Sequence, residues 1–144
     1  MDANLVRRVA FAAVAIPLAL GLVWYGGMML ALVLGVAGAL GARELFDLAA
    51  RSGVRAIRPL GIASAALLPP LVYAAGVTAE AGEWAVHWWP YLVALWVLLL
   101  LGWVLAVRRP TDQPMAAAGI TLLAVLYTGA LPAFLLVVRH TRYP

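Results

Sequence analysis

Residues 9–42, VAFAAVAIPLALGLVWYGGMMLALVLGVAGALGA, carry no charged side chain and are interrupted near their middle by a glycine pair at positions 26 and 27. A helix needs about 20 apolar residues to cross the hydrocarbon core of a bilayer, so this stretch is long enough for two spans. Glycine accepts the positive φ that a short reversal requires, which places the break at Gly26-Gly27. With so short a connection, the two spans are expected to be antiparallel neighbours.

The composition of the whole chain also indicates a membrane protein. Its 144 residues are 66% hydrophobic and 11% charged, with a mean hydropathy of +1.00. Soluble domains carry about a quarter charged residues, so the solvent of this chain must be lipid. All basic residues are arginines, which stand singly or in pairs between apolar stretches. That distribution is typical of membrane topology signals and argues against nucleic-acid binding, which needs a basic face with stacking aromatics.

The hydrophobic stretches predict an all-α, polytopic integral membrane bundle of about five transmembrane helices. We expect a single transmembrane domain over residues 1–144. A kink is expected at Pro69-Pro70, because proline removes a backbone donor. The polar and aromatic residues 80–89 are expected to form a connection. The predicted spans cover residues 5–25, 28–50, 60–79, 90–107 and 115–138.

The arginines predict the orientation of the chain. Cytoplasmic connections are enriched in basic residues, and tryptophan and tyrosine gather at the membrane surfaces. We therefore expect a multi-pass protein of the inner (cytoplasmic) membrane with a cytoplasmic amino terminus. Arg139 and Arg142 are exceptions, since an odd number of spans places them outside. The arginines placed inside are Arg7, Arg8, Arg43, Arg51, Arg55, Arg58, Arg108 and Arg109.

The inner end of the second span carries the charges closest to the hydrocarbon. Arg43, Asp47 and Arg51 follow one another at intervals of four residues, so they share one stripe of a helix that Gly53 is expected to end. Arg43 and Arg51 are the candidate substrate-binding residues, because together they could grip the phosphate of a lipid headgroup. The alternative is a self-neutralised helix extension along the membrane surface, in which Asp47 pairs with both arginines.

Small residues line the second span. Ala31, Gly35 and Ala39 follow the small-xxx-small spacing that lets helices approach closely. Packing against the first or third span within one molecule is the expected use of this stripe, and a homodimer contact is the alternative.

The sequence predicts no catalytic and no metal-binding residue. Glu83 and His87 lie four residues apart, but no further histidine, cysteine or well-placed carboxylate completes a metal shell. The sequence contains no phosphate-loop, serine-hydrolase or zinc-protease motif.

Three stretches of the chain resemble the opening of bacterial phosphatidate cytidylyltransferases. The first is an arginine pair before a proline-bearing span, Arg8-Val-Ala-Phe-Ala-Ala-Val-Ala-Ile-Pro17. The second is a glycine- and alanine-rich span that ends in Arg43-Glu-Leu-Phe-Asp-Leu-Ala49. The third is Leu126-Tyr127-Thr-Gly-Ala-Leu-Pro132 followed by Leu135-Leu-Val-Val-Arg139, which is similar to a Tyr-x-Gly span of the family.

The resemblance implies an enzyme of phospholipid biosynthesis that joins CTP to phosphatidic acid, with CDP-diacylglycerol and pyrophosphate as products. Magnesium is the cofactor that the family implies, and no ligand for it is evident in this chain. The family's Ser-x-x-Lys segment, with its later aspartate, glycine and histidine, is not found in these residues. We therefore expect the chain to be the amino-terminal half of a longer enzyme, to form its membrane scaffold and to be inactive alone.

A second hypothesis comes from a different class: a small non-catalytic membrane scaffold, or a transporter half that acts as an oligomer. Broken helices, such as one interrupted at Pro69-Pro70, can build substrate sites in transporters. Against this hypothesis, no span has a charge at its centre that would couple transport to an ion gradient.

Overall fold

The computed structural model describes residues 3–77 and 79–140, with side chains described for 6–76, 87–109 and 111–138. Within these ranges the chain is helical almost throughout and has no β-strand. Five helical stretches are long and apolar enough to cross a membrane, which confirms the predicted all-α membrane fold. The elements are α1 (Ala3–Tyr25), α2 (Gly27–Arg51), α3 (Arg58–Val77), α4 (Ala79–Val107), η1 (Pro110–Asp112), α5 (Pro114–Ala124), η2 (Val125–Ala130) and α6 (Leu131–His140).

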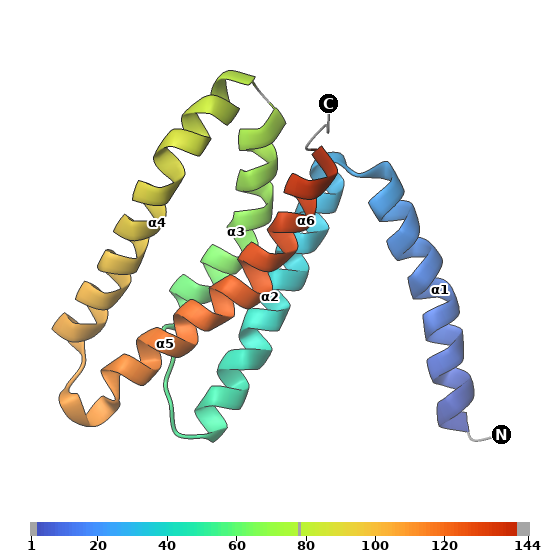
Figure 1. The fold of residues 1–144 in the computed structure, drawn as a ribbon. Coiled ribbons are helices and arrows are strands. Elements are labelled where there is room, and N and C mark those ends of the chain that lie inside the picture. Colours follow the sequence, from blue (N-terminus) through green and yellow to red (C-terminus); the bar gives the residue numbers. More distant parts are fainter. Residues whose placement is uncertain (1–2, 78, 141–144) are drawn as a thin grey trace.

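The helices are arranged as a closely packed centre with one helix leaning away on each side (Figure 1). Helix α2, helix α3 and the last span, which consists of α5, η2 and α6, cross one another in the centre. Helix α1 leans away on one side, and no residue of its spanning segment is buried. Helix α4 diverges on the other side. The start of α1 and the end of α6 lie at opposite ends of the bundle, as five crossings require (Figure 1).

Three glycines with positive φ set the ends of α2. Gly26 and Gly27 have φ values of 66° and 63°, so the reversal between α1 and α2 uses the left-handed region that glycine alone adopts freely. Gly53 has a φ of 82° and follows the helix end. Its N–H donates to the carbonyl of Ala50, and the next N–H, of Val54, donates to Ala49. This pair of bonds is a Schellman motif, and it confirms the predicted end of α2.

The predicted connection over residues 80–89 is wrong. Helix α4 begins at Ala79 and continues through Pro90 to Val107. The segment contains alanine and glutamate, which favour helix, and its aromatic residues suit a helix that passes through the membrane surface. The polar and aromatic residues of this segment are those of a helix end near the membrane surface, and they were misinterpreted as a loop.

Prolines remove the usual hydrogen-bond donor of three backbone carbonyls in the centre of the bundle. Each proline within a helix removes the N–H that would bond to the carbonyl four residues earlier, yet α3 remains helical through its two prolines. A membrane interior offers no water to such a carbonyl, so neighbouring helices must accommodate it. The positions four residues before Pro69, Pro70 and Pro132 are Ala65, Ala66 and Thr128.

All three of these carbonyls lie against the glycine stripe of α2. A Cβ atom on Gly38 would stand 2.6 Å from the oxygen of Thr128 and 2.9 Å from that of Ala65, and a Cβ on Gly35 would overlap the oxygen of Ala66. Glycine therefore allows the backbones to meet directly, in a geometry that suits Cα–H···O contacts. The stripe is used for packing within one molecule, against the third and last spans.

The last span changes helix type at the same crossing. Residues Val125–Ala130 are π-helical, and the N–H of Leu131 donates to the carbonyl of Leu126, five residues back. Before this segment, Ala118 of α5 packs against α4, and after it, Leu136 of α6 packs against α2. The π-helical segment therefore redirects the span from one neighbour to another.

Candidate functional site

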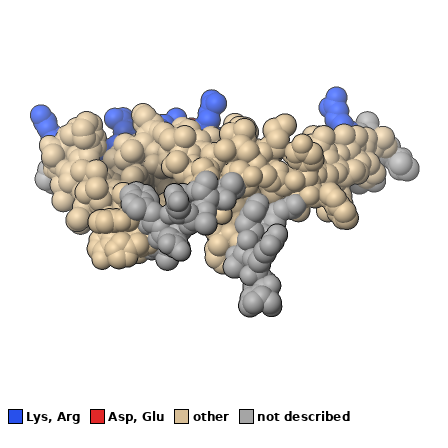
Figure 2. All heavy atoms as spheres, turned by 90° about the horizontal axis from the view of Figure 1, so that it is seen from above, with Lys and Arg blue, Asp and Glu red and all other residues tan. Residues whose placement is uncertain are grey.

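The candidate site lies where α2 ends and α3 begins. This end of the bundle also holds the start of α1 and the connection from α4 to α5 (Figure 1). Viewed from the opposite end, the described surface shows arginines only where they project past one long edge, and it shows no acidic residue (Figure 2). Among the side chains that the structure describes, at residues 6–76, 87–109 and 111–138, the arginines and the acidic residues all belong to this end of the bundle.

An ion pair between two helices organises this end. The guanidinium of Arg58, the first residue of α3, donates from Nη2 to Oδ1 of Asp47 at 2.5 Å and to the carbonyl of Phe46 at 3.4 Å. The two side chains are half-buried. The pair joins the last turns of α2 to the first turn of α3.

The predicted pairs Arg43–Asp47 and Asp47–Arg51 are therefore wrong. Asp47 is paired with Arg58 across the helix–helix contact, and no ion pair of Arg43 or Arg51 occurs within the described part of the chain. A guanidinium from a neighbouring helix can reach the carboxylate and a backbone carbonyl together. The i,i+4 spacing along α2 could not indicate that Arg58, a residue of another helix, is the partner of Asp47.

Arg43 and Arg51 are exposed and share one stripe of α2. Neither guanidinium has a hydrogen-bond partner among the described side chains. The arrangement can present two positive charges to an anionic group, with the acid between them already engaged elsewhere. Their role in substrate binding stays a prediction.

A buried hydroxyl holds the segment that leads to Arg58. The N–H of Ile57 donates to Oγ1 of Thr121 at 3.0 Å, and this hydroxyl in turn donates to the carbonyl of Ala117 at 2.7 Å. Thr121 is fully buried. Helix α5 thereby satisfies a free backbone donor just before α3, which fixes the approach to Arg58. Sequence reasoning missed this residue, although a hydroxyl in an otherwise apolar span was its signal.

The described residues do not make a magnesium site. Magnesium prefers several oxygen ligands in octahedral geometry, but Asp47 is bound to Arg58, and Oδ2 of Asp112 accepts a hydrogen bond from the N–H of Arg109 at 3.3 Å. No three acidic or histidine residues come together in the described part of the chain. Of the pair Glu83 and His87, the Glu83 side chain lies outside the described residues.

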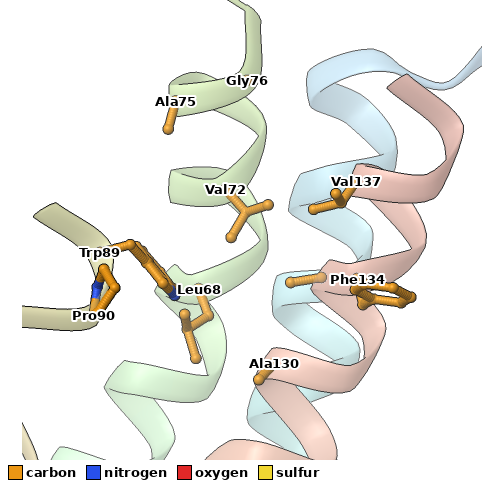
Figure 3. A pocket seen from close by; sticks show the side chains of 10 residues that line it. Leu68, Val72, Ala75, Gly76, Trp89, Pro90, Ala130, Phe134 and Val137 are labelled. Atoms are coloured by element: carbon orange, nitrogen blue, oxygen red, sulfur yellow. The ribbon is translucent and has the colours of Figure 1, made fainter. Parts of the chain in front are cut away.

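An apolar groove lies toward the other end of the bundle, between α3, α4 and α6. Its volume is about 520 Å³, within the range of ligand pockets. The indole of Trp89 lies over Leu68, and Val72 and Val137 face each other across the gap (Figure 3). The groove exists because the π-helical segment turns α6 away from α4. Among its described lining residues, the side chain with a polar group is that of Trp89, whose indole N–H can donate a hydrogen bond, and none of these residues is titratable.

Comparison with known protein families matches residues 6–143 to the cytidylyltransferase family. The chain belongs to this family. No curated protein and no solved structure matches it. The chemistry of the cytidylyltransferase family is nucleotidyl transfer, so this chain is a multi-pass membrane member of a family of nucleotidyltransferases.

Two of the stretches that resemble the cytidylyltransferase family can be located in the structure. The stretch Arg43–Ala49 is the last part of α2, where Asp47 meets Arg58. The stretch Leu126–Pro132 contains most of the π-helical segment, whose Thr128 lies against Gly38. Both stretches therefore lie at contacts between helices.

Proposed function

We propose that the chain is the amino-terminal membrane region of a CTP:phosphatidate cytidylyltransferase, which makes CDP-diacylglycerol and pyrophosphate for phospholipid biosynthesis. The family match over residues 6–143 carries this proposal. It favours the enzyme over the scaffold or transporter hypothesis. Phosphatidic acid and CTP are the proposed substrates of the whole enzyme, and the groups that act on CTP, with any magnesium ligands, are proposed to lie outside the described residues.

Within this enzyme, Arg43 and Arg51 are proposed to hold the phosphate of phosphatidic acid at the membrane surface. Arginine suits this task, because its planar guanidinium stays charged and binds phosphate oxygens in pairs. The two residues lie about 12 Å apart along the last turns of a helix that is long enough to cross a membrane, which supports a place near the membrane surface. A diacylglycerol body would then extend along the apolar surface of the bundle.

The proposed reaction is tested by pyrophosphate release. Vesicles that contain the full-length gene product are supplied with CTP and either phosphatidic acid or phosphatidylcholine. We expect pyrophosphate and CDP-diacylglycerol to form only with CTP and phosphatidic acid together. The 144-residue chain alone is expected to produce neither. Product formation from another lipid phosphate, with none from phosphatidic acid, would overturn the proposed substrate.

We further propose that the amino terminus is cytoplasmic and that the membrane is the inner membrane of the cell. The absence of cysteine makes the test simple, because single cysteines can be placed at exposed positions. Tyr25→Cys is expected to react with a membrane-impermeant maleimide from outside the cell, and Ser52→Cys only after permeabilisation. The reverse labelling pattern would show the opposite orientation.

A further inference from the structure

We infer that Arg58 is a positioning residue for the lipid-phosphate site, because it holds Asp47 away from Arg43 and Arg51. This inference rests on the proposed function of those two arginines. It concerns a residue of α3 that the sequence did not assign to any site. The structural basis is the ion pair between Arg58 and Asp47 across the contact between α2 and α3.

Asp47 could compete with a lipid phosphate for Arg43 and Arg51, because it lies on the same stripe of α2. It lies four residues after Arg43 and four residues before Arg51, so its carboxylate is within reach of either guanidinium. A carboxylate bound to these arginines would compete directly with a lipid phosphate for the same donors. In the structure this competition is reduced, because Arg58 binds Oδ1 of the carboxylate.

Arg58 is well placed to keep Asp47. Its guanidinium also donates to the carbonyl of Phe46, which fixes its direction at the end of α2. The backbone just before it is anchored by the hydrogen bond from Ile57 to the buried hydroxyl of Thr121. Arg58 is therefore pre-organised to pair with Asp47. When Arg58 is removed, Asp47 needs only a side-chain rotation to pair with Arg43 or Arg51.

Two other charged residues at this end provide controls. Arg55 is exposed and forms no ion pair within the described residues, so Arg55→Gln removes one positive charge and leaves the pair intact. Glu44 is exposed on α2 and likewise unpaired in that part of the chain. Glu44→Gln therefore removes one negative charge without freeing Arg58.

The experiment measures how strongly spin-labelled phosphatidic acid associates with the protein, relative to spin-labelled phosphatidylcholine, in phosphatidylcholine vesicles. We expect the wild type to prefer phosphatidic acid, and Arg43→Gln with Arg51→Gln to abolish the preference. Arg58→Gln is expected to lower the relative affinity about two- to fivefold, the range that an exposed ion pair supports. Arg55→Gln is expected to lower it less.

Double variants separate positioning from net charge. Arg58→Gln combined with Asp47→Asn is expected to restore the wild-type affinity, because the competing carboxylate is gone. Arg58→Gln combined with Glu44→Gln has the same net charge and is expected to remain weak. Asp47→Asn alone is expected to bind at least as well as the wild type, which keeps the test valid if variants at position 58 fold poorly.

The outcomes distinguish this inference from the function on which it rests. A wild type without any preference for phosphatidic acid would overturn the proposed lipid site and this inference with it. A preference that needs Arg43 and Arg51, combined with equal effects of Arg58→Gln and Arg55→Gln, would overturn the inference alone. Failure of Asp47→Asn to rescue Arg58→Gln would do the same, because it would show that Arg58 does not act by holding Asp47.

Discussion

The centre of the bundle and its two outer helices differ in how closely they are packed. In the centre, α2, α3 and the last span bring their backbones together at Gly35 and Gly38, around carbonyls whose usual donor four residues later is replaced by a proline. On the outside, α1 has no buried residue in its spanning segment, and α4 is buried only in part. Because lipid is as apolar as the side chains, exposure of an apolar helix costs little in a membrane, whereas an unpaired carbonyl costs much. Close packing is therefore concentrated where the backbone needs it.

The largest expected effect compares two phenylalanines. Phe46 is 1% exposed between α2 and α3, whereas Phe11 of α1 is 76% exposed. We expect Phe46→Ala to lower the free energy of unfolding by about 3 kcal/mol, the lower end of the range for buried phenylalanine, because in micelles the cavity contributes more than transfer from water. Phe11→Ala is expected to change it by less than about 0.5 kcal/mol. Thermal unfolding in detergent, followed by circular dichroism, measures both, and equal effects would remove the contrast.

The second effect adds one methyl group at a backbone contact. Gly38→Ala would place a Cβ against the carbonyls of Ala65 and Thr128, and we expect a loss of about 2 kcal/mol from overpacking. Gly102→Ala in α4 meets no atom within 4 Å, so the better helix propensity of alanine should leave the protein unchanged or up to about 1 kcal/mol more stable. The same unfolding measurement applies, and a stabilising Gly38→Ala would contradict the described crossing.

The smallest effect compares two buried threonines of the last span. Thr121 accepts a hydrogen bond from Ile57, whereas the hydroxyl of Thr128 donates within its own span, to Ala124. We expect Thr121→Val to cost about 1 kcal/mol, because the N–H of Ile57 loses its acceptor, and Thr128→Val to cost less. Hydrogen exchange at the amide of Ile57 sharpens the test: it should accelerate in the first variant alone.

The sequence predicted the fold well because the relevant signals were local. Apolar length predicted the spans, and Gly26-Gly27 and Gly53 marked turns whose positive φ requires glycine. The contacts between helices were harder to predict from the sequence. Asp47 has oppositely charged neighbours at both i,i+4 positions, and only the packing of α3 on α2 shows that Arg58 is its partner. The hydrogen bond from Ile57 to Thr121 likewise joins residues that are 64 positions apart.

The reversal at Gly26-Gly27 makes α1 a long lever on a two-residue pivot. A helix of 23 residues is about 35 Å long, so a rotation of about 10° at the pivot moves its far end by about 6 Å. Helix α1 has no buried residue in its spanning segment and leans away from the other helices (Figure 1), so we expect its tilt to respond to the hydrophobic thickness of the surrounding bilayer. The distance between the Arg7-Arg8 pair and the end of α2 is therefore expected to vary with the hydrophobic thickness of the membrane.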